Sequence, residues 1–177
     1  PVHTLPQLDE IIKQTATNTG LIAIIDSRQW DGDEGQLENI AFYLDPDTRT
    51  IPNNAIKKTR LVEIADGPSV IERSKELKKI HPQIVTAIRV ELTAAGIERA
   101  IKLAEIKEVE VIHIVADANG NELAASNPRF IKDMTRHIHT ALIEKGIRDE
   151  ITLAAGGGIA LPEHMAKEII CGADLVT

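Results

Sequence analysis

The sequence predicts an α/β fold built on a parallel β-sheet, and three observations lead to that prediction. Apolar residues make up 43% of the 177 positions, while aromatic residues make up only 2%. A core rich in Ile, Leu, Val and Ala with few aromatic rings is typical of buried parallel strands covered by helices. Short apolar runs alternate along the chain with segments of helical periodicity, which is the order that parallel strands joined by helices require.

The first half of the chain contains two predicted strands and one predicted helix. Their boundaries follow from apolar runs, from helical spacing and from turn signals such as Asp66-Gly67-Pro68. An amphipathic segment over 5–17 and an apolar run over 21–25 come first, and we then expect strands over 40–44 and 60–65 and a helix over 69–80.

The second half has a more regular rhythm. Apolar side chains recur at helical spacing between its strands, and Gly146 is placed to end the longest helix. We expect strands over 84–90, 109–115, 151–155 and 173–177, and helices over 95–107, 128–145 and 162–171.

The spacing of these units favours a (β/α)8 barrel. Each strand and helix together take about 25–40 residues, and a whole barrel needs roughly 250. About five or six units therefore predict a TIM-barrel-like fold that is the C-terminal part of the barrel, incomplete in this chain, with residues 1–177 as one partial domain. We expect neighbouring strands to lie parallel in chain order, and another segment or chain to complete the sheet.

The run Gly156-Gly157-Gly158 directly follows the apolar strand over 151–155. Glycines at the carboxyl end of a strand let backbone N–H groups approach an anion, and a following helix start adds a favourable dipole. The run is therefore a candidate phosphate site, and the alternative is a tight turn that packs a helix onto the sheet. On the first interpretation, Gly157→Val would exclude the anion and leave the fold largely intact.

The net charge and the cysteine content of the chain limit which partners and metal clusters it can bind. The net charge of −7 argues against nucleic acid or an anionic membrane, and no apolar run is long enough to span a bilayer. The one cysteine, Cys171, cannot form an internal disulfide or hold an iron–sulfur cluster or zinc alone. With no visible signal peptide, we expect a cytoplasmic protein.

Residues 84–177 resemble the FMN-binding synthase barrel of glutamate synthases, especially the archaeal-type related proteins. Their order and spacing match the last four strands of that barrel. The matching pieces are Val85-Thr-Ala-Ile-Arg-Val90, Val111-Ile-His-Ile-Val-Ala-Asp117, Ala141-Leu-Ile-Glu-Lys-Gly-Ile-Arg-Asp149, Gly157-Gly158-Ile159 and Gly172-Ala-Asp174.

The resemblance implies an FMN cofactor, with its phosphate at Gly157 and Gly158 and with Gly156 where the family usually has an aspartate. It implies that Arg89, where the family usually has a lysine, lies near the flavin ring, and that Asp117 faces flavin and substrate. An iron–sulfur cluster would relay electrons, but its ligands are not in this chain. An electron donor protein or a further chain segment is the expected partner.

The resemblance thus implies an oxidoreductase that aminates 2-oxoglutarate with glutamine-derived ammonia. The alternative is a non-catalytic barrel subunit or scaffold within a larger redox complex. A phosphate-sugar aldolase or isomerase is a third possibility, and the lack of a mid-strand lysine for a Schiff base counts against the aldolase. From the residues alone, Arg89 could instead pair with Glu63 or Glu91, and Asp117 could start the Asn119-Gly120 turn.

Overall fold

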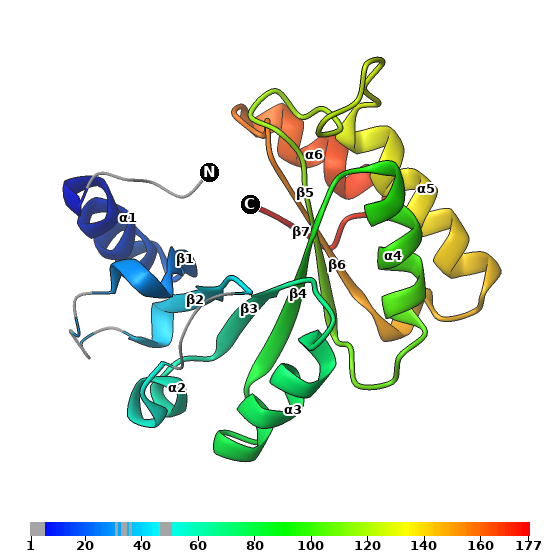
Figure 1. Cartoon of the computed structure of the whole chain (residues 1–177). Helices are drawn as coiled ribbons and strands as arrows, with labels where there is room; N and C mark the ends of the chain where they lie inside the picture. Colours follow the sequence, from blue (N-terminus) through cyan, green and yellow to red (C-terminus); the bar gives the residue numbers. More distant parts are fainter. Residues whose placement is uncertain (1–5, 31, 33–34, 36, 47–50) are drawn as a thin grey trace. The chain divides into compact units, whose positions relative to one another are not determined.

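The computed structural model describes residues 6–30, 32, 35, 37–46 and 51–177 (Figure 1). It has the α/β, TIM-barrel-like fold that the sequence predicts, with parallel strands alternating with helices. The chain divides into two compact units, residues 1–87 and 88–177.

The first unit contains a three-stranded parallel arrangement, β1-β2-β3. Ala23 of β1 lies opposite Ile40 of β2, and Tyr43 of β2 lies opposite Glu63 of β3. Its elements are α1 (Pro6–Thr19), β1 (Ala23–Asp26), β2 (Ile40–Leu44), α2 (Asn53–Lys58), β3 (Leu61–Ala65) and α3 (Val70–Ile80).

The second unit continues the strand–helix alternation, with strand order β4-β5-β6-β7. The pairs β5–β6 and β6–β7 are parallel, as predicted. Its elements are β4 (Val85–Glu91), which begins in the first unit, α4 (Ala94–Ala104), β5 (Val111–Val115), α5 (Ile131–Glu144), β6 (Thr152–Gly156), α6 (Pro162–Ile170) and β7 (Leu175–Val176).

The two faces of the β5–β6 pair differ in chemistry. Ile112 lies opposite Leu153, and both side chains are fully buried. On the other face His113 lies opposite Ala154, and the His113 Nε2 atom is 3.0 Å from the Thr177 Oγ1 atom. The strand period of two therefore separates an apolar face from a face with a buried imidazole.

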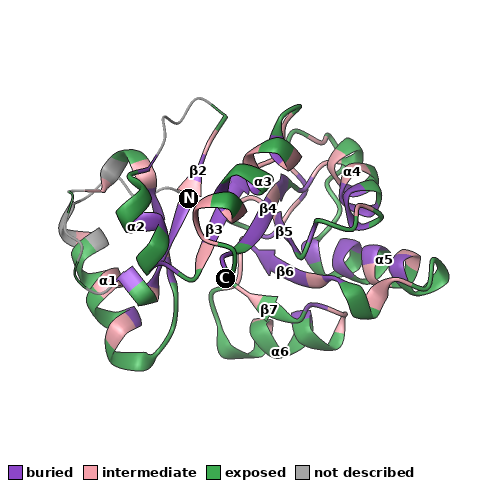
Figure 2. Cartoon of the chain, turned by 90° about the horizontal axis from the view of Figure 1, so that it is seen from below, coloured by how far each residue is buried: buried purple, intermediate pink, exposed green. Residues whose placement is uncertain are grey.

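Helices α4 and α5 bury their apolar stripes and expose their polar sides (Figure 2). In α4 the four residues expected on one face, Ile97, Ala100, Ile101 and Ala104, are all buried. Gly146, with φ +70°, follows the end of α5 as predicted. Of the described helices, none is both long and apolar enough to cross a membrane.

Three local differences from the predictions have physical causes. Helix α2 was not expected, because six residues after Pro52 are too few to show helical periodicity. Strand β7 is shorter than 173–177, because Ala173 and Asp174 belong to the turn that enters it. Gly156 is the last residue of β6 and not part of the turn, since its carbonyl accepts a hydrogen bond from the Ala116 N–H.

Candidate functional site

The glycine turn, residues 157–161, connects β6 to α6 and has a backbone that requires glycine. Gly157 has φ +99° and Gly158 has φ +69°. L-residues with a side chain rarely adopt such angles, whereas glycine does so freely. The predicted order of strand, glycine turn and helix is therefore confirmed, with α6 beginning at Pro162.

The glycine turn packs directly against the loop that follows β5. A Cβ atom on Gly157 would lie 2.5 Å from the Ala116 carbonyl oxygen, and one on Gly158 would lie 2.3 Å from the Gly120 backbone nitrogen. Both glycines thus permit a contact between two backbone segments. Their first role is that of a tight turn. Gly157→Val would force the loops apart, so the expectation that it leaves the fold intact is wrong.

The glycine turn also presents backbone donors. Within the described part of the chain, the N–H groups of Gly157, Gly158 and Ile159 have no hydrogen-bond acceptor. All three residues are partly accessible to solvent. Consecutive N–H groups around residues with positive φ form a concavity that favours anions, and the start of α6 adds the positive end of its dipole. The same backbone segment can therefore form a tight turn and also bind an anion.

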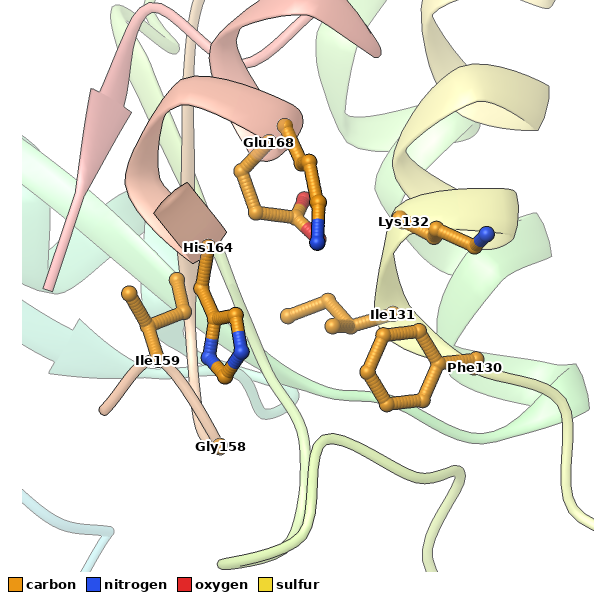
Figure 3. A pocket seen from close by; sticks show the side chains of 8 residues that line it. Phe130, Ile131, Lys132, Gly158, Ile159, His164 and Glu168 are labelled. Atoms are coloured by element: carbon orange, nitrogen blue, oxygen red, sulfur yellow. The ribbon is translucent and has the colours of Figure 1, made fainter. Parts of the chain in front are cut away.

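A cavity of about 370 Å³ adjoins the glycine turn, between the first turns of α5 and α6 (Figure 3). We call it the α5–α6 cavity. Its wall combines apolar, basic and acidic side chains, and the two lysines bring positive charge close to the turn. The lining residues are Phe130, Ile131, Lys132, Gly158, Ile159, His164, Lys167 and Glu168.

Glu168 is the buried ionisable group of this cavity. Its side chain accepts a hydrogen bond of 3.0 Å from the Thr135 hydroxyl group. Burial raises the pKa of the Glu168 carboxyl group, and the nearby Asp133 acts in the same direction. The Thr135 hydrogen bond and Lys132 oppose this shift without cancelling it. Glu168 therefore stays protonated up to a higher pH than an ordinary glutamate does.

Asp117 organises the loop after β5. Its Oδ1 atom accepts hydrogen bonds of 2.8 Å from both the Asn119 and the Asn121 backbone N–H groups. The Gly120 N–H in turn donates to the Asp117 carbonyl oxygen. The turn-forming alternative is therefore confirmed for Asp117, and its catalytic role stays a prediction.

An ion pair between the buried Glu122 and the exposed Arg129 closes the same loop. The Arg129 guanidinium group donates to both Glu122 carboxylate oxygens, at 2.9 and 2.7 Å. This hydrogen bonding lowers the pKa of Glu122 and raises that of Arg129. The Glu122 N–H also donates to the Arg129 carbonyl oxygen. The pair thereby holds the loop that packs against Gly157 and Gly158.

Arg89 lies on β4 and is half-buried. It does not line the α5–α6 cavity, and it interacts with other groups of the protein. Gly156 faces His113 and Thr177, since a Cβ atom there would lie 2.8 Å from the His113 Nε2 atom. The site thus brings together Gly157, Gly158 and the Asp117 turn, whereas the assignment of Arg89 as catalytic and of Gly156 as cofactor-binding stays a prediction.

Sequence patterns did not indicate Glu168, Thr135 or the two lysines of the cavity. In α6, Leu161, Met165 and Ile169 recur every four residues and predict a buried apolar stripe, yet they are 50%, 48% and 46% exposed. Glu168 is the buried residue of this helix. Periodicity therefore did not identify the buried position, which lies about 60° around the helix from the centre of that stripe.

Comparison with known proteins gives a weak sequence similarity and a similarity of fold. No family model matches the chain. The polyketide biosynthesis protein ThaF of Burkholderia thailandensis is 23% identical over 122 residues, which are 63% of this chain and 11% of that protein. The chain thus spans about a tenth of the length of this curated relative.

A solved structure described as "QR15, an Aldolase" is similar in fold. Its TM-score is 0.63 at 15% sequence identity, and the match covers 95% of this chain and 83% of that chain. At this identity the similarity concerns the fold, and it agrees with the TIM-barrel-like fold described above.

These findings overturn the interpretation as a glutamate synthase barrel. Neither of the two proteins just described is a glutamate synthase. The amination of 2-oxoglutarate and the redox-scaffold alternative therefore both lose their support. The matching pieces were a glycine pair, a Gly-Ala-Asp turn and apolar strands, which serve turn formation in many (β/α) folds. FMN, the iron–sulfur cluster and the electron donor followed from that resemblance alone, and their binding stays untested.

The described residues do not assemble a metal site. No group of three or more His, Cys, Asp or Glu side chains in that part of the chain is arranged to hold a metal ion. Cys171 is a half-buried free thiol. The groups available for chemistry at the candidate site are the backbone N–H groups, the lysines, Glu168 and the His113–Thr177 pair.

Proposed function

We propose that the chain is part of a (β/α)-barrel enzyme that binds a phosphate ester at the glycine turn and catalyses an aldolase-type reaction on it. The observation that supports this most directly is the set of three N–H groups, at Gly157, Gly158 and Ile159, without acceptors in the described protein. They lie at the carboxyl end of β6, where ligands of parallel α/β folds bind. The similarity to a solved aldolase supports the reaction class.

The glycine turn would hold the phosphate group through its backbone donors. Lys132 and Lys167, which line the adjoining cavity, would offset the charge of the phosphate. The rest of the substrate would then lie over the ends of β5 and β6. There, the hydrogen bond between the His113 and Thr177 side chains links a buried imidazole to an exposed hydroxyl group and offers a path for a proton.

A Schiff-base route has little support in this chain. None of the seven described strands contains a lysine, and the lysines of the α5–α6 cavity come from helices. Aldol cleavage also proceeds when acid–base groups stabilise the enolate formed as the carbon–carbon bond breaks. We propose this acid–base route for the protein.

The first test is binding of inorganic phosphate, followed through backbone amide NMR shifts. We expect the Gly157, Gly158 and Ile159 amide signals to shift with a dissociation constant of about 1 mM, a typical strength for a small anion on a few donors. Gly146 is the internal control, because its φ of +70° matches that of Gly158 while it lies outside the cavity lining. Shifts at Gly146 but not at the glycine turn would contradict the phosphate site.

The second test separates the two aldolase routes. The protein is incubated with a phosphorylated hydroxyketone, treated with borohydride and analysed by intact-mass spectrometry, while cleavage products are assayed in parallel. We expect cleavage without a covalent adduct, because an acid–base route forms no imine that borohydride could reduce. A stable adduct on Lys132 or Lys167 would overturn the acid–base route, and the absence of cleavage across a panel of such ketones would overturn the reaction class.

A further inference from the structure

Glu168 is an unusual side chain for the surface helix that carries it. It is 3% exposed, whereas all other residues of α6 are exposed or half-buried. Its one hydrogen-bond partner in the described structure is Thr135 of α5, whose side chain is fully buried and donates to the Oε2 atom. The carboxyl group is thus held in a fixed position between two helices.

The second carboxyl oxygen of Glu168 faces the α5–α6 cavity. In the described part of the protein, the Oε1 atom has no hydrogen-bond partner, and Glu168 belongs to the lining of the cavity. Figure 3 shows the carboxyl group pointing into the space bordered by His164, Ile131 and Lys132. Among the described side chains, Ser27 Oγ is the buried polar atom without a partner, so the Glu168 Oε1 atom keeps contact with solvent through the cavity. A ligand hydroxyl group could therefore replace water there and hydrogen-bond to the carboxyl group.

We propose that Glu168 binds a hydroxyl group of the ligand whose phosphate lies on the glycine turn, so that the site selects phosphate esters of hydroxylated compounds. This inference rests on the proposed function, because it uses the same phosphate position. Gly158 and Ile159 line the cavity together with Glu168, so one small molecule can reach both the backbone donors and the carboxyl group.

The surroundings favour a hydroxyl group over other partners. Lys132 and Lys167 repel an ammonium group, and the Glu168 carboxylate repels a second anionic group. A hydroxyl group can donate to a carboxylate and accept from a protonated carboxyl group, so it fits either state of Glu168. Phe130, Ile131 and Ile159 supply an apolar wall for the carbon chain. The cavity volume of about 370 Å³ lies in the range of small-metabolite sites.

The experiment compares two phosphate esters that differ in their hydroxyl groups. Dissociation constants of glycerol 3-phosphate and methyl phosphate are measured by NMR titration, for the wild type, Glu168→Gln and Glu168→Met. We expect the wild type to bind glycerol phosphate about tenfold more tightly, which corresponds to one good hydrogen bond to a charged group. Glu168→Gln should keep most of this preference, because an amide also bonds a hydroxyl group. In Glu168→Met the ratio of the two dissociation constants should fall to about one, because a thioether is only a weak hydrogen-bond acceptor.

The outcomes separate this inference from the function on which it rests. Equal binding of the two esters by the wild type, or a tenfold preference that persists in Glu168→Met, would overturn the role of Glu168 and leave the phosphate site in place. If inorganic phosphate and both esters fail to shift the glycine-turn amides, the proposed function falls and this inference falls with it. Should Glu168→Met fail to fold, the wild type decides the question through intermolecular nuclear Overhauser effects. Contacts between the glycerol carbon protons and the Glu168 γ protons are expected, and their absence would overturn the role of Glu168.

Discussion

The Gly158→Ala variant is expected to lose about 4 kcal/mol of unfolding free energy, among the largest effects of a single substitution in this protein. Two costs add together. At φ +69° an alanine pays about 1–2 kcal/mol for the left-handed backbone. Its Cβ atom would also lie 2.3 Å from the Gly120 nitrogen and 2.6 Å from the Asn119 carbonyl carbon, so the two loops must separate. Urea unfolding followed by circular dichroism measures the loss.

Gly146→Ala provides a matched control for this prediction. Gly146 has φ +70°, nearly the same as Gly158, but no atom lies within 4 Å of the position that its Cβ would occupy. The control should lose only the backbone cost, about 1–2 kcal/mol. Equal losses in the two variants would show that the contact between the glycine turn and the Asp117 loop does not contribute to stability.

The Arg148→Ala variant is expected to lose about 3 kcal/mol, because one side chain connects four parts of the second unit. The Arg148 guanidinium group donates to the His139 ring, to the Ile151 and Gly172 carbonyl oxygens, and to both carboxylate oxygens of Asp174 at 2.8 and 2.9 Å. Asp174 in turn accepts from the Leu153 N–H at 2.8 Å. Removal of the guanidinium group takes the Arg148 donor away from the His139 ring, the two carbonyl oxygens and the Asp174 carboxylate.

A surface ion pair gives the comparison for Arg148→Ala. Lys145 pairs with Glu105, and their side chains are 42% and 48% exposed. Since exposed pairs contribute little, Lys145→Ala should lose less than about 0.5 kcal/mol. A similar small loss in Arg148→Ala would show that the hydrogen bonds of Arg148 are replaced by water without cost.

The same cluster predicts a pH dependence with a definite sign. Burial alone would raise the pKa of Asp174, but the hydrogen bonds from Arg148 and the Leu153 N–H lower it below its ordinary 3.8. The stabilisation is therefore complete above pH 3.8 and is lost as the pH falls through the lower folded-state value. The difference in unfolding free energy between the wild type and Arg148→Ala should then be largest near neutral pH and shrink as the pH falls below 3.8. A difference independent of pH would contradict this linkage.

The order of elements was predictable because it depends on local patterns. Alternation and apolar runs identified six of the seven strands and marked β1 as an apolar run. Gly146 and the Gly156–Gly158 run correctly marked the end of one helix and the end of one strand. The function was not predictable in the same way. A glycine pair and a Gly-Ala-Asp turn describe how a chain bends, and proteins with different chemistry share them. The glutamate synthase interpretation took these turn residues as evidence of a particular cofactor.

The sequence by itself determined the class of fold and the place of the glycine turn, because helical and strand periodicity and backbone freedom are properties of neighbouring residues. Only the tertiary structure decided which polar groups meet. Glu168 and Thr135 are 33 positions apart, and Arg148 and Asp174 are 26 apart. Their contacts form because α5, α6 and the ends of β6 and β7 pack together, and no local pattern encodes that packing. For the same reason α6 buries a glutamate and exposes Met165 and Ile169, against its own periodicity.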